Sequence, residues 1–306
     1  MPPPTLLAVP NVSEGADEAT IAALRGAIES SGGGVRLLDT HSDADHGRSV
    51  FTFAGGPREL AGATVRLAAE AVARIDLARS GRTGQHPHVG VLDVAPVVYL
   101  DEASRGAACA EALLLAERLG QELEIPVLLY GELTADESRP PRRRAELRRG
   151  GAARLAERLS AGQDDPEALR PDFGPARARP DRGATLVAAR QPLVAFNVEL
   201  APPAGVEDAR RIAALVREGG EHGLPGLRAI GIELQGGAGQ VSMNVERPLE
   251  LALAEVVRAL AVHAPLARAE LVGLAPAAAF DGFPEELPVP GFDPRRHLIE
   301  NALGSG

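Results

Sequence analysis

The 306-residue chain has no tryptophan, a single cysteine and only 3% aromatic residues. With Cys109 alone, neither an intramolecular disulfide nor a cysteine metal cluster can form, and the alanine- and leucine-rich run around it favours a buried, inert thiol. No apolar run reaches the roughly 18 residues of a membrane span, and no positively charged leader precedes the first apolar segment. We therefore expect a protein of the reducing cytoplasm that makes no contact with a membrane.

A basic excess is also missing, because the formal net charge is −10 at pH 7. Surfaces that bind nucleic acid or anionic lipid need clustered positive charge, so we expect no nucleic-acid partner. Any anionic ligand must be bound by a local group of basic side chains. The 45% hydrophobic and 24% charged residues are typical of a globular chain long enough for two domains.

Several common active-site motifs are absent from the sequence. It contains no phosphate loop of the form G-x-x-x-x-G-K-S/T and no dinucleotide G-x-G-x-x-G after the first predicted strand. It also lacks the G-x-S-x-G nucleophile elbow and the zinc motif H-E-x-x-H. Nucleotide binding, serine hydrolysis and zinc proteolysis are therefore disfavoured.

The hydrophobic periodicity predicts an α+β fold. In the first half, strands are expected at 5–10, 34–40, 48–55, 89–100 and 125–131, with helices around 21–28, 60–75 and 107–123. The second half predicts strands at 193–200, 227–234, 239–246 and 269–274, with helices on Ile212, Leu215 and Val216 and on Leu249, Leu253, Val256 and Leu260. This β-α-β-β-α-β order is typical of ferredoxin-like sandwiches, and the first half can be read in the same way.

We therefore predict two similar ferredoxin-like α/β sandwich subdomains, 1–180 with its linker and 181–306, with a ligand cleft between them. The linker is the proline- and charge-rich segment 133–182, which holds one expected helix. Its arginine run, "RPPRRRAELRRG", is interpreted first as a solvated helix start, with an anion site as the alternative.

Polar residues gather where the predicted strands end. Asp39, His41, Asp43, Asp45 and His46 form the densest cluster, which is open to three interpretations: a solvated turn, hydrogen bonds to a ligand, or a metal site. No metal is included in our prediction.

A second polar cluster is the segment "GQHPH", which runs into the strand at 89–100. Pro87 restricts the backbone beside His86, and Gly84 and Gly90 allow close packing. His86 is therefore either a general base, the role that suits an imidazole near neutral pH, or an ordinary loop histidine.

Eight segments, in order along nearly the whole chain, resemble the formiminotransferase domain of glutamate formimidoyltransferases. They are "VPNVSEG" (9–15), "RSVFTFAG" (48–55), "GQHPHVGVLDVAP" (84–96), "IPVLLYGE" (125–132), "PDFGP" (171–175), "GATLVAARQPLVAFNVEL" (183–200), "QVSMN" (240–244) and "ELVGLAP" (270–276). The resemblance implies two α/β subdomains, a homodimer, and formimidoyl transfer between N-formimidoyl-L-glutamate and tetrahydrofolate in histidine degradation. The cyclodeaminase domain fused to some members is not expected here.

The resemblance also implies roles for individual residues. The family's catalytic histidine corresponds to His86, and its folate loop corresponds to Gly174–Gly183, so the expected folate contacts include Pro175 and Arg182. Asp39 and Gln240 are candidate pterin contacts. The expected substrate contacts are the polar strand-end residues Asn11, Ser13 and Asn244, together with Arg48 and Arg190, whose guanidinium groups match a carboxylate.

The sequence departs from the family pattern close to the expected site. The family's H-x-G-E-H-P-R reads Arg82-Thr83-Gly84-Gln85-His86-Pro87-His88, so a carboxylate and a permanent positive charge beside His86 are replaced. Arg182 stands where the family pattern has an aromatic residue. Two alternatives therefore stay open: a related transferase with another one-carbon donor or acceptor, and a folate-binding paralogue without catalysis.

Overall fold

The computed structural model describes residues 3–78, 88–135, 140–162 and 164–304. The protein has an α+β fold and divides into two compact units, Met1–Gln191 and Pro192–Gly306. This division falls after the predicted boundary at residues 180 and 181, because strand β7 (Thr185–Arg190) pairs within the sheet of the first unit. No helix in the described ranges has both the length and the apolar character needed to cross a lipid bilayer.

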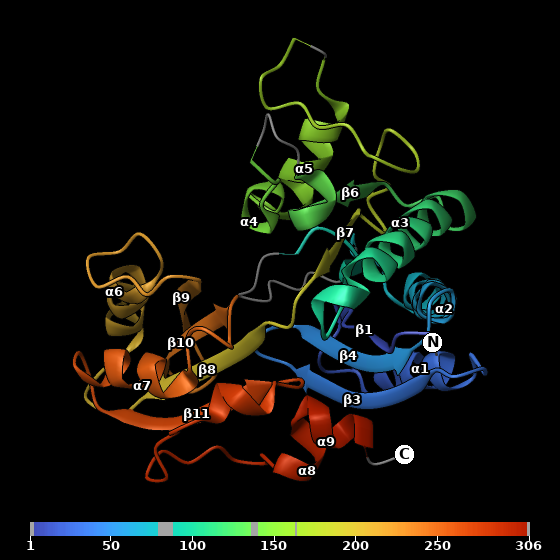
Figure 1. Ribbon diagram of the computed structural model, residues 1–306. Coiled ribbons are helices and arrows are strands. Elements are labelled where there is room, and N and C mark those ends of the chain that lie inside the picture. Colours follow the sequence, from blue (N-terminus) through green and yellow to red (C-terminus); the bar gives the residue numbers. More distant parts are fainter. Residues whose placement is uncertain (1–2, 79–87, 136–139, 163, 305–306) are drawn as a thin grey trace. The chain divides into compact units, whose positions relative to one another are not determined.

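The first unit is built on one mixed sheet (Figure 1). Its strands are β1 (Leu6–Ala8), β2 (Asn11–Val12), β3 (Arg36–Asp43), β4 (Arg48–Gly55), β5 (Leu92–Val98), β6 (Val127–Leu129) and β7. They lie in the order β1-β4-β2-β5-β7-β6, and β3 pairs with the outer side of β4. Strand β7 runs parallel to both of its neighbours, β5 and β6.

Three amphipathic helices cover one face of this sheet. They are α1 (Glu18–Glu29), α2 (Glu59–Arg74) and α3 (Arg105–Glu122), and the short 3-10 helix η1 (Glu102–Ser104) leads into α3. Asp17 caps α1 by accepting a hydrogen bond from the Ala19 amide. Leu24, Leu67 and Leu115 from the three helices pack with Phe51 and Phe53 of β4 in one core.

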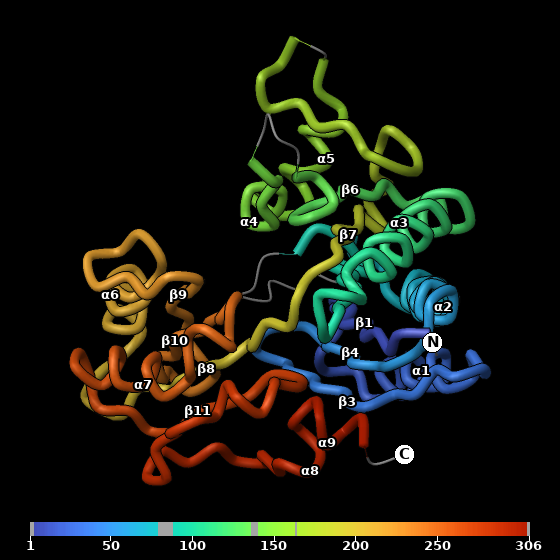
Figure 2. Tube along the Cα trace, in the orientation of Figure 1, coloured from blue at the N-terminus to red at the C-terminus, as the bar shows by residue number. Residues whose placement is uncertain are grey.

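The opposite face is covered in part by a helical insert that follows β6. After the 3-10 helix η2 (Gly131–Thr134), α4 (Arg144–Leu147) and α5 (Gly151–Ser160) pack Leu147, Leu155 and Leu159 against Val94, Leu128 and Leu186. The tube in Figure 2 shows the chain leaving α5, looping outward and returning to β7. Two helices therefore lie in the segment for which the sequence predicted one.

The second unit follows the predicted β-α-β-β-α-β order of elements. These are β8 (Val194–Leu200), α6 (Val206–Val216), β9 (Leu227–Glu233), β10 (Gly239–Val245), α7 (Leu253–Ala261) and β11 (Leu266–Val272). The antiparallel strands are ordered β11-β8-β10-β9, and α6 and α7 cover one face of them. Leu249 precedes α7 and is 69% exposed, although the sequence pattern placed it on this helix.

Shorter elements follow β11 in the second unit. They are the 3-10 helix η3 (Ala277–Phe280), α8 (Pro294–His297) and α9 (Ile299–Gly304). Phe280 stacks on Phe292 with ring centroids 4.5 Å apart, and Phe283 meets Phe196 of β8 edge-on. The first unit continues beyond the β-α-β-β-α-β order with α3, β6, α4, α5 and β7, so the two halves differ in size.

Two glycines of α3 provide a matched test of this packing. A Cβ added to Gly120 would lie 2.6 Å from the Gly174 nitrogen, whereas a Cβ on Gly106 would meet no atom within 4 Å. We expect Gly120→Ala to lower the free energy of unfolding by about 1–3 kcal/mol through overpacking. Gly106→Ala should leave it unchanged or raise it by up to about 1 kcal/mol, because alanine is the better helix former. Urea unfolding of the two variants measures both effects, and equal losses would contradict the close approach of α3 to residue 174.

Candidate active site

One face of the first sheet is polar where α4 and α5 do not cover it. Paired residues on neighbouring strands share a face, and side chains two residues apart along a strand also do. Val94 pairs with both Asn11 and Leu186, which places Asn11 on the face against which α4 and α5 pack. The same registers add Asp39, His41, Asp43, Arg48 and Thr52 from β3 and β4. The fold thus brings three predicted site residues, Asn11, Asp39 and Arg48, onto one sheet face.

The histidine- and aspartate-rich segment forms the turn between β3 and β4. Asp43 accepts a hydrogen bond from the His46 amide at 2.9 Å, its other carboxylate oxygen lies 2.7 Å from His46 Nδ1, and the His46 side chain is fully buried. Burial acts to raise the pKa of Asp43, but its contacts with the ring and amide of His46 and the charge attraction from His46 outweigh it and lower that pKa to about 2. This part of the cluster is a hydrogen-bonded turn, but one with a buried imidazole.

Arg48, at the start of β4, is half-buried in a positively charged environment. Burial and repulsion from Arg148 and Arg144 lower the pKa of its guanidinium to about 10, against attraction from Asp43 and Asp93. No ion pair joins Arg48 to a carboxylate of the described residues. Its guanidinium can still bind an anion, and the carboxylate contact expected of Arg48 stays a prediction.

The predicted folate loop is fixed by close backbone packing at both ends. Gly174 has φ +80°, and a Cβ there would lie 2.3 Å from the Ile125 carbonyl oxygen. Gly183 has φ +69°, and its Cβ would lie 2.2 Å from the Val89 carbonyl oxygen. Only glycine tolerates both the positive φ and this clearance. Pro175, next to Gly174, is half-buried.

The C-terminal end of this loop is hydrogen-bonded to described residues that precede and follow His86 in the sequence. The Leu77 amide donates to the Asp181 carbonyl at 3.0 Å, and the Val91 amide donates to the Arg182 carbonyl at 2.9 Å. The Ala184 amide donates in turn to the Val89 carbonyl at 3.0 Å. His86 itself lies outside the described residues, but the described residues on either side of it are thus joined to the predicted folate loop.

Several predicted contact residues have structural roles in the fold. The Ser13 hydroxyl donates to the Gly90 carbonyl at 2.7 Å, directly after the His86 segment. Arg182 donates to the Leu123 carbonyl at 2.8 Å, and Arg190 donates to the Gln191 carbonyl at 2.9 Å. Ser13 and Arg182 therefore stabilise the loops around the candidate site through backbone carbonyls.

In the second unit, Gln240 and Asn244 share one face of β10, opposite the face that α6 and α7 cover. Gln240 is 5% exposed, and its buried side-chain oxygen has no hydrogen-bond partner in the part of the chain that the structure describes. On the neighbouring strand, Asn197 donates to Glu270 at 2.8 Å. A buried amide oxygen without a donor is a feature that a ligand hydrogen bond would explain.

Sequence reasoning missed a buried ion pair beside the site. Asp93, in β5, accepts a hydrogen bond from the Val89 amide at 2.9 Å and pairs with Arg148, which follows α4. Both side chains are less than a tenth exposed. A single acidic residue inside the apolar strand "VGVLDVAPVVYL" was the available signal, because a buried carboxylate requires a partner. The solvated interpretation of the arginine run was therefore wrong for Arg148, while Arg143 and Arg149 are exposed.

Acid titration tests the Asp43–His46 turn. The pKa of Asp43 is about 2 in the folded protein and has its ordinary value of 3.8 in the unfolded chain. The Asp43 carboxylate therefore stabilises the fold above pH 3.8 and loses that effect as the pH falls through 2. We expect Asp43→Asn to lower the free energy of unfolding by at most about 2 kcal/mol at pH 6 and by less at pH 3. Urea titrations at both pH values measure this, with Asp45→Asn as the control. An equal loss at both pH values would instead attribute the effect to packing.

Comparisons with known proteins identify the family of this chain. Residues 5–190 match the family model described as formiminotransferase domain, N-terminal subdomain. The chain is 34% identical over 303 residues to glutamate formimidoyltransferase of Streptococcus pyogenes serotype M1, with 96% of this chain and 97% of that protein covered. It is 32% identical over 299 residues to glutamate formimidoyltransferase of Thermoplasma acidophilum, covering 96% and 89%.

A bifunctional relative matches over part of its length. The chain is 36% identical over 320 residues to formimidoyltransferase-cyclodeaminase of Sus scrofa, with 97% of this chain and 56% of that protein covered. The alignments thus extend beyond the first unit into the second. The extent and identity of these matches show that the chain belongs to the formiminotransferase family and is a transferase enzyme.

Proposed function

We propose that the protein transfers a formimidoyl group from N-formimidoyl-L-glutamate to tetrahydrofolate, within cytoplasmic histidine degradation. The observation that carries the proposal is the hydrogen bonding of residues 181–184 to Leu77, Val89 and Val91. These bonds join described residues on either side of the expected base, His86, to the end of the expected folate loop. A base and a folate at one site are what this transfer requires. The names of the relatives support the same reaction.

In the proposed reaction, the N5 nitrogen of tetrahydrofolate attacks the amidine carbon of N-formimidoyl-L-glutamate. A tetrahedral intermediate forms and collapses with loss of the glutamate amine, which gives 5-formimidoyltetrahydrofolate and L-glutamate. His86 removes the proton from the attacking nitrogen and returns it to the leaving amine, so no external acid or base is consumed. Holding both substrates in one orientation supplies much of the remaining acceleration.

The two units contribute different contacts in this proposal. Asp39, on the polar face of the first sheet, and Gln240, on the face of the second sheet opposite α6 and α7, would contact the pterin. We propose further that the units are related ferredoxin-like sandwiches, that the ligand cleft lies between them, and that the protein is a homodimer. The element order of the second unit and the polar faces of both sheets support this arrangement.

Replacement of His86 tests the proposed role directly. We expect His86→Ala to lower kcat for 5-formimidoyltetrahydrofolate formation by ~10²-fold or more, the usual loss when a general base is removed. His222→Ala, in the second unit, removes an imidazole far from this segment of the sequence and should leave kcat unchanged. Steady-state assays with N-formimidoyl-L-glutamate and tetrahydrofolate measure both variants.

Two results would contradict the proposal. Full activity of His86→Ala would exclude this residue as the base. A wild-type protein that binds tetrahydrofolate without transfer from N-formimidoyl-L-glutamate would exclude the reaction itself. Turnover with a formyl donor or another amino acid would then identify a related transferase.

A further inference from the structure

Three arginines lie beside the polar sheet face of the first unit, one from the sheet and two from the helical insert that packs on it. Arg48 lies on β4, Arg144 begins α4 and Arg148 directly follows it. Burial and repulsion from Arg148 and Arg144 lower the pKa of the Arg48 guanidinium, and burial and repulsion from Arg144 lower that of Arg148. Like charges are held together in a folded protein only where something offsets their repulsion.

The carboxylates nearby do not balance this charge. Asp93 pairs with Arg148 and also accepts the Val89 amide, while Asp43 is bonded to His46. Among the described residues, neither Arg48 nor Arg144 has an ion pair. Two guanidinium groups thus retain free donors in a chain whose net charge is −10, and a partly buried charge without a partner is costly.

Two buried donors in the same place also lack partners. Within the ranges that the structure covers, the Tyr130 hydroxyl and the Arg148 Nε make no hydrogen bond, although both residues are only 7% exposed. Tyr130 lies close enough to Arg148 to act on the pKa of its guanidinium, in the direction that raises it. A buried tyrosine hydroxyl ordinarily has a hydrogen-bond partner, so these donors indicate an acceptor supplied from outside the chain.

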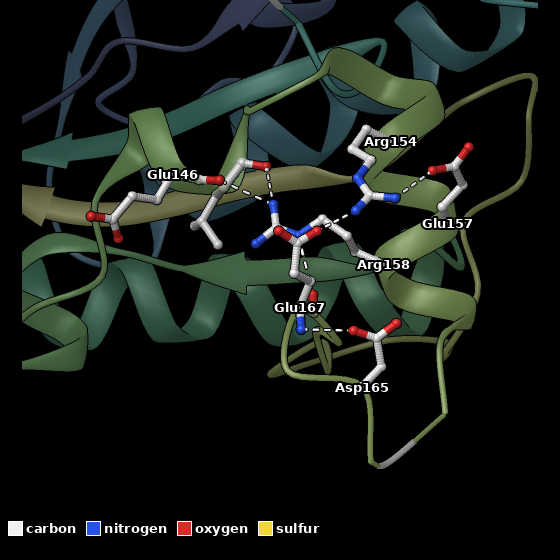
Figure 3. A network of polar contacts seen from close by, with 7 residues as sticks. Glu146, Arg154, Glu157, Arg158, Asp165 and Glu167 are labelled. Atoms are coloured by element: carbon white, nitrogen blue, oxygen red, sulfur yellow. Dashed lines mark hydrogen bonds and ion pairs between the residues drawn. The ribbon is translucent and has the colours of Figure 1, made fainter.

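The helix that carries Arg144 is held firmly by its neighbours. Figure 3 shows Arg158 of α5 reaching the C-terminal end of α4, where it donates to the Glu146 carbonyl at 3.0 Å. Arg158 also donates to the Glu167 carbonyl at 3.2 Å, and Arg154 pairs with Glu157 and Glu167. This network fixes α4 relative to α5, so Arg144 is presented without the entropy cost of ordering a loop.

We propose that Arg48, Arg144 and Arg148, together with Tyr130, form a carboxylate-binding subsite. Planar guanidinium groups bind carboxylates bidentately, and the tyrosine hydroxyl donates a further hydrogen bond. The subsite lies beside Asp93, which holds the end of the His86 segment through Val89. Its assignment to a substrate rests on the proposed function. The same chemistry is offered by the amino-acid substrate and by the glutamyl tail of folate.

Binding of glutarate and L-glutamate tests the subsite without any turnover. Calorimetry should show both dicarboxylates binding to wild type, while L-glutamine binds more weakly than L-glutamate.

We expect Arg144→Gln to weaken glutarate binding by about tenfold or more, as for the loss of a charged hydrogen-bonding partner. Tyr130→Phe removes a hydroxyl alone and should give a smaller loss. Arg143→Gln, an exposed arginine of the same run, is the control and should bind as wild type. Equal binding by the Arg144 and Arg143 variants would overturn the proposal.

Steady-state kinetics then separates the two sources of the carboxylate. A higher KM for N-formimidoyl-L-glutamate in Arg144→Gln assigns the subsite to the amino acid. A higher KM for tetrahydrofolate, absent with tetrahydropteroate, assigns it to the glutamyl tail. Unchanged KM values for both substrates would overturn the subsite and leave the transfer reaction intact. Glutarate binding that depends on Arg144 in a protein without transfer activity would support the subsite and contradict the proposed function.

Discussion

Direct backbone packing between residues 89–91 and 182–184 is the contact on which the candidate site depends. A Cβ on Gly90 would lie 2.0 Å from the Ala184 carbonyl oxygen, and one on Gly183 would lie 2.2 Å from that of Val89. The two glycines let these two backbone segments touch without side chains between them. The Thr185 hydroxyl extends the contact by donating to the Leu92 carbonyl at 2.7 Å. The described residues 89–91 and the C-terminal end of the predicted folate loop are therefore packed directly together.

Charge is organised around this contact by a few buried side chains. Asp93 connects the end of the His86 segment to Arg148 and therefore to the arginine-rich insert. Arg48 approaches the same insert from the sheet, and Asp43 is held in its own turn by His46. A chain of net charge −10 thus contains a local positive region.

The sequence predicted the elements whose patterns are local. Alternating and helical periodicities located every strand of the second unit and α1, α2 and α3 of the first. Strand β7, "TLVAAR", was missed because it is short, rich in alanine and buried between two parallel neighbours that are distant in sequence. Arg148 was missed for a related reason, since its partner Asp93 lies on another element and an arginine run alone suggests a solvated helix. Motif order and residue chemistry gave Asp39, Arg48 and the 174–183 loop as expected contacts, and these stay predictions, whereas the residues that support them carry no such signal.

Hydrogen exchange with and without tetrahydrofolate tests most directly whether the two loops form one site. If they do, we expect bound folate to slow amide exchange in peptides from both 77–91 and 174–184, because Leu77, Val89 and Val91 are hydrogen-bonded to residues 181–184. Protection of 174–184 alone, with exchange in 77–91 unchanged, would contradict a shared site and separate the folate loop from the segment that contains His86.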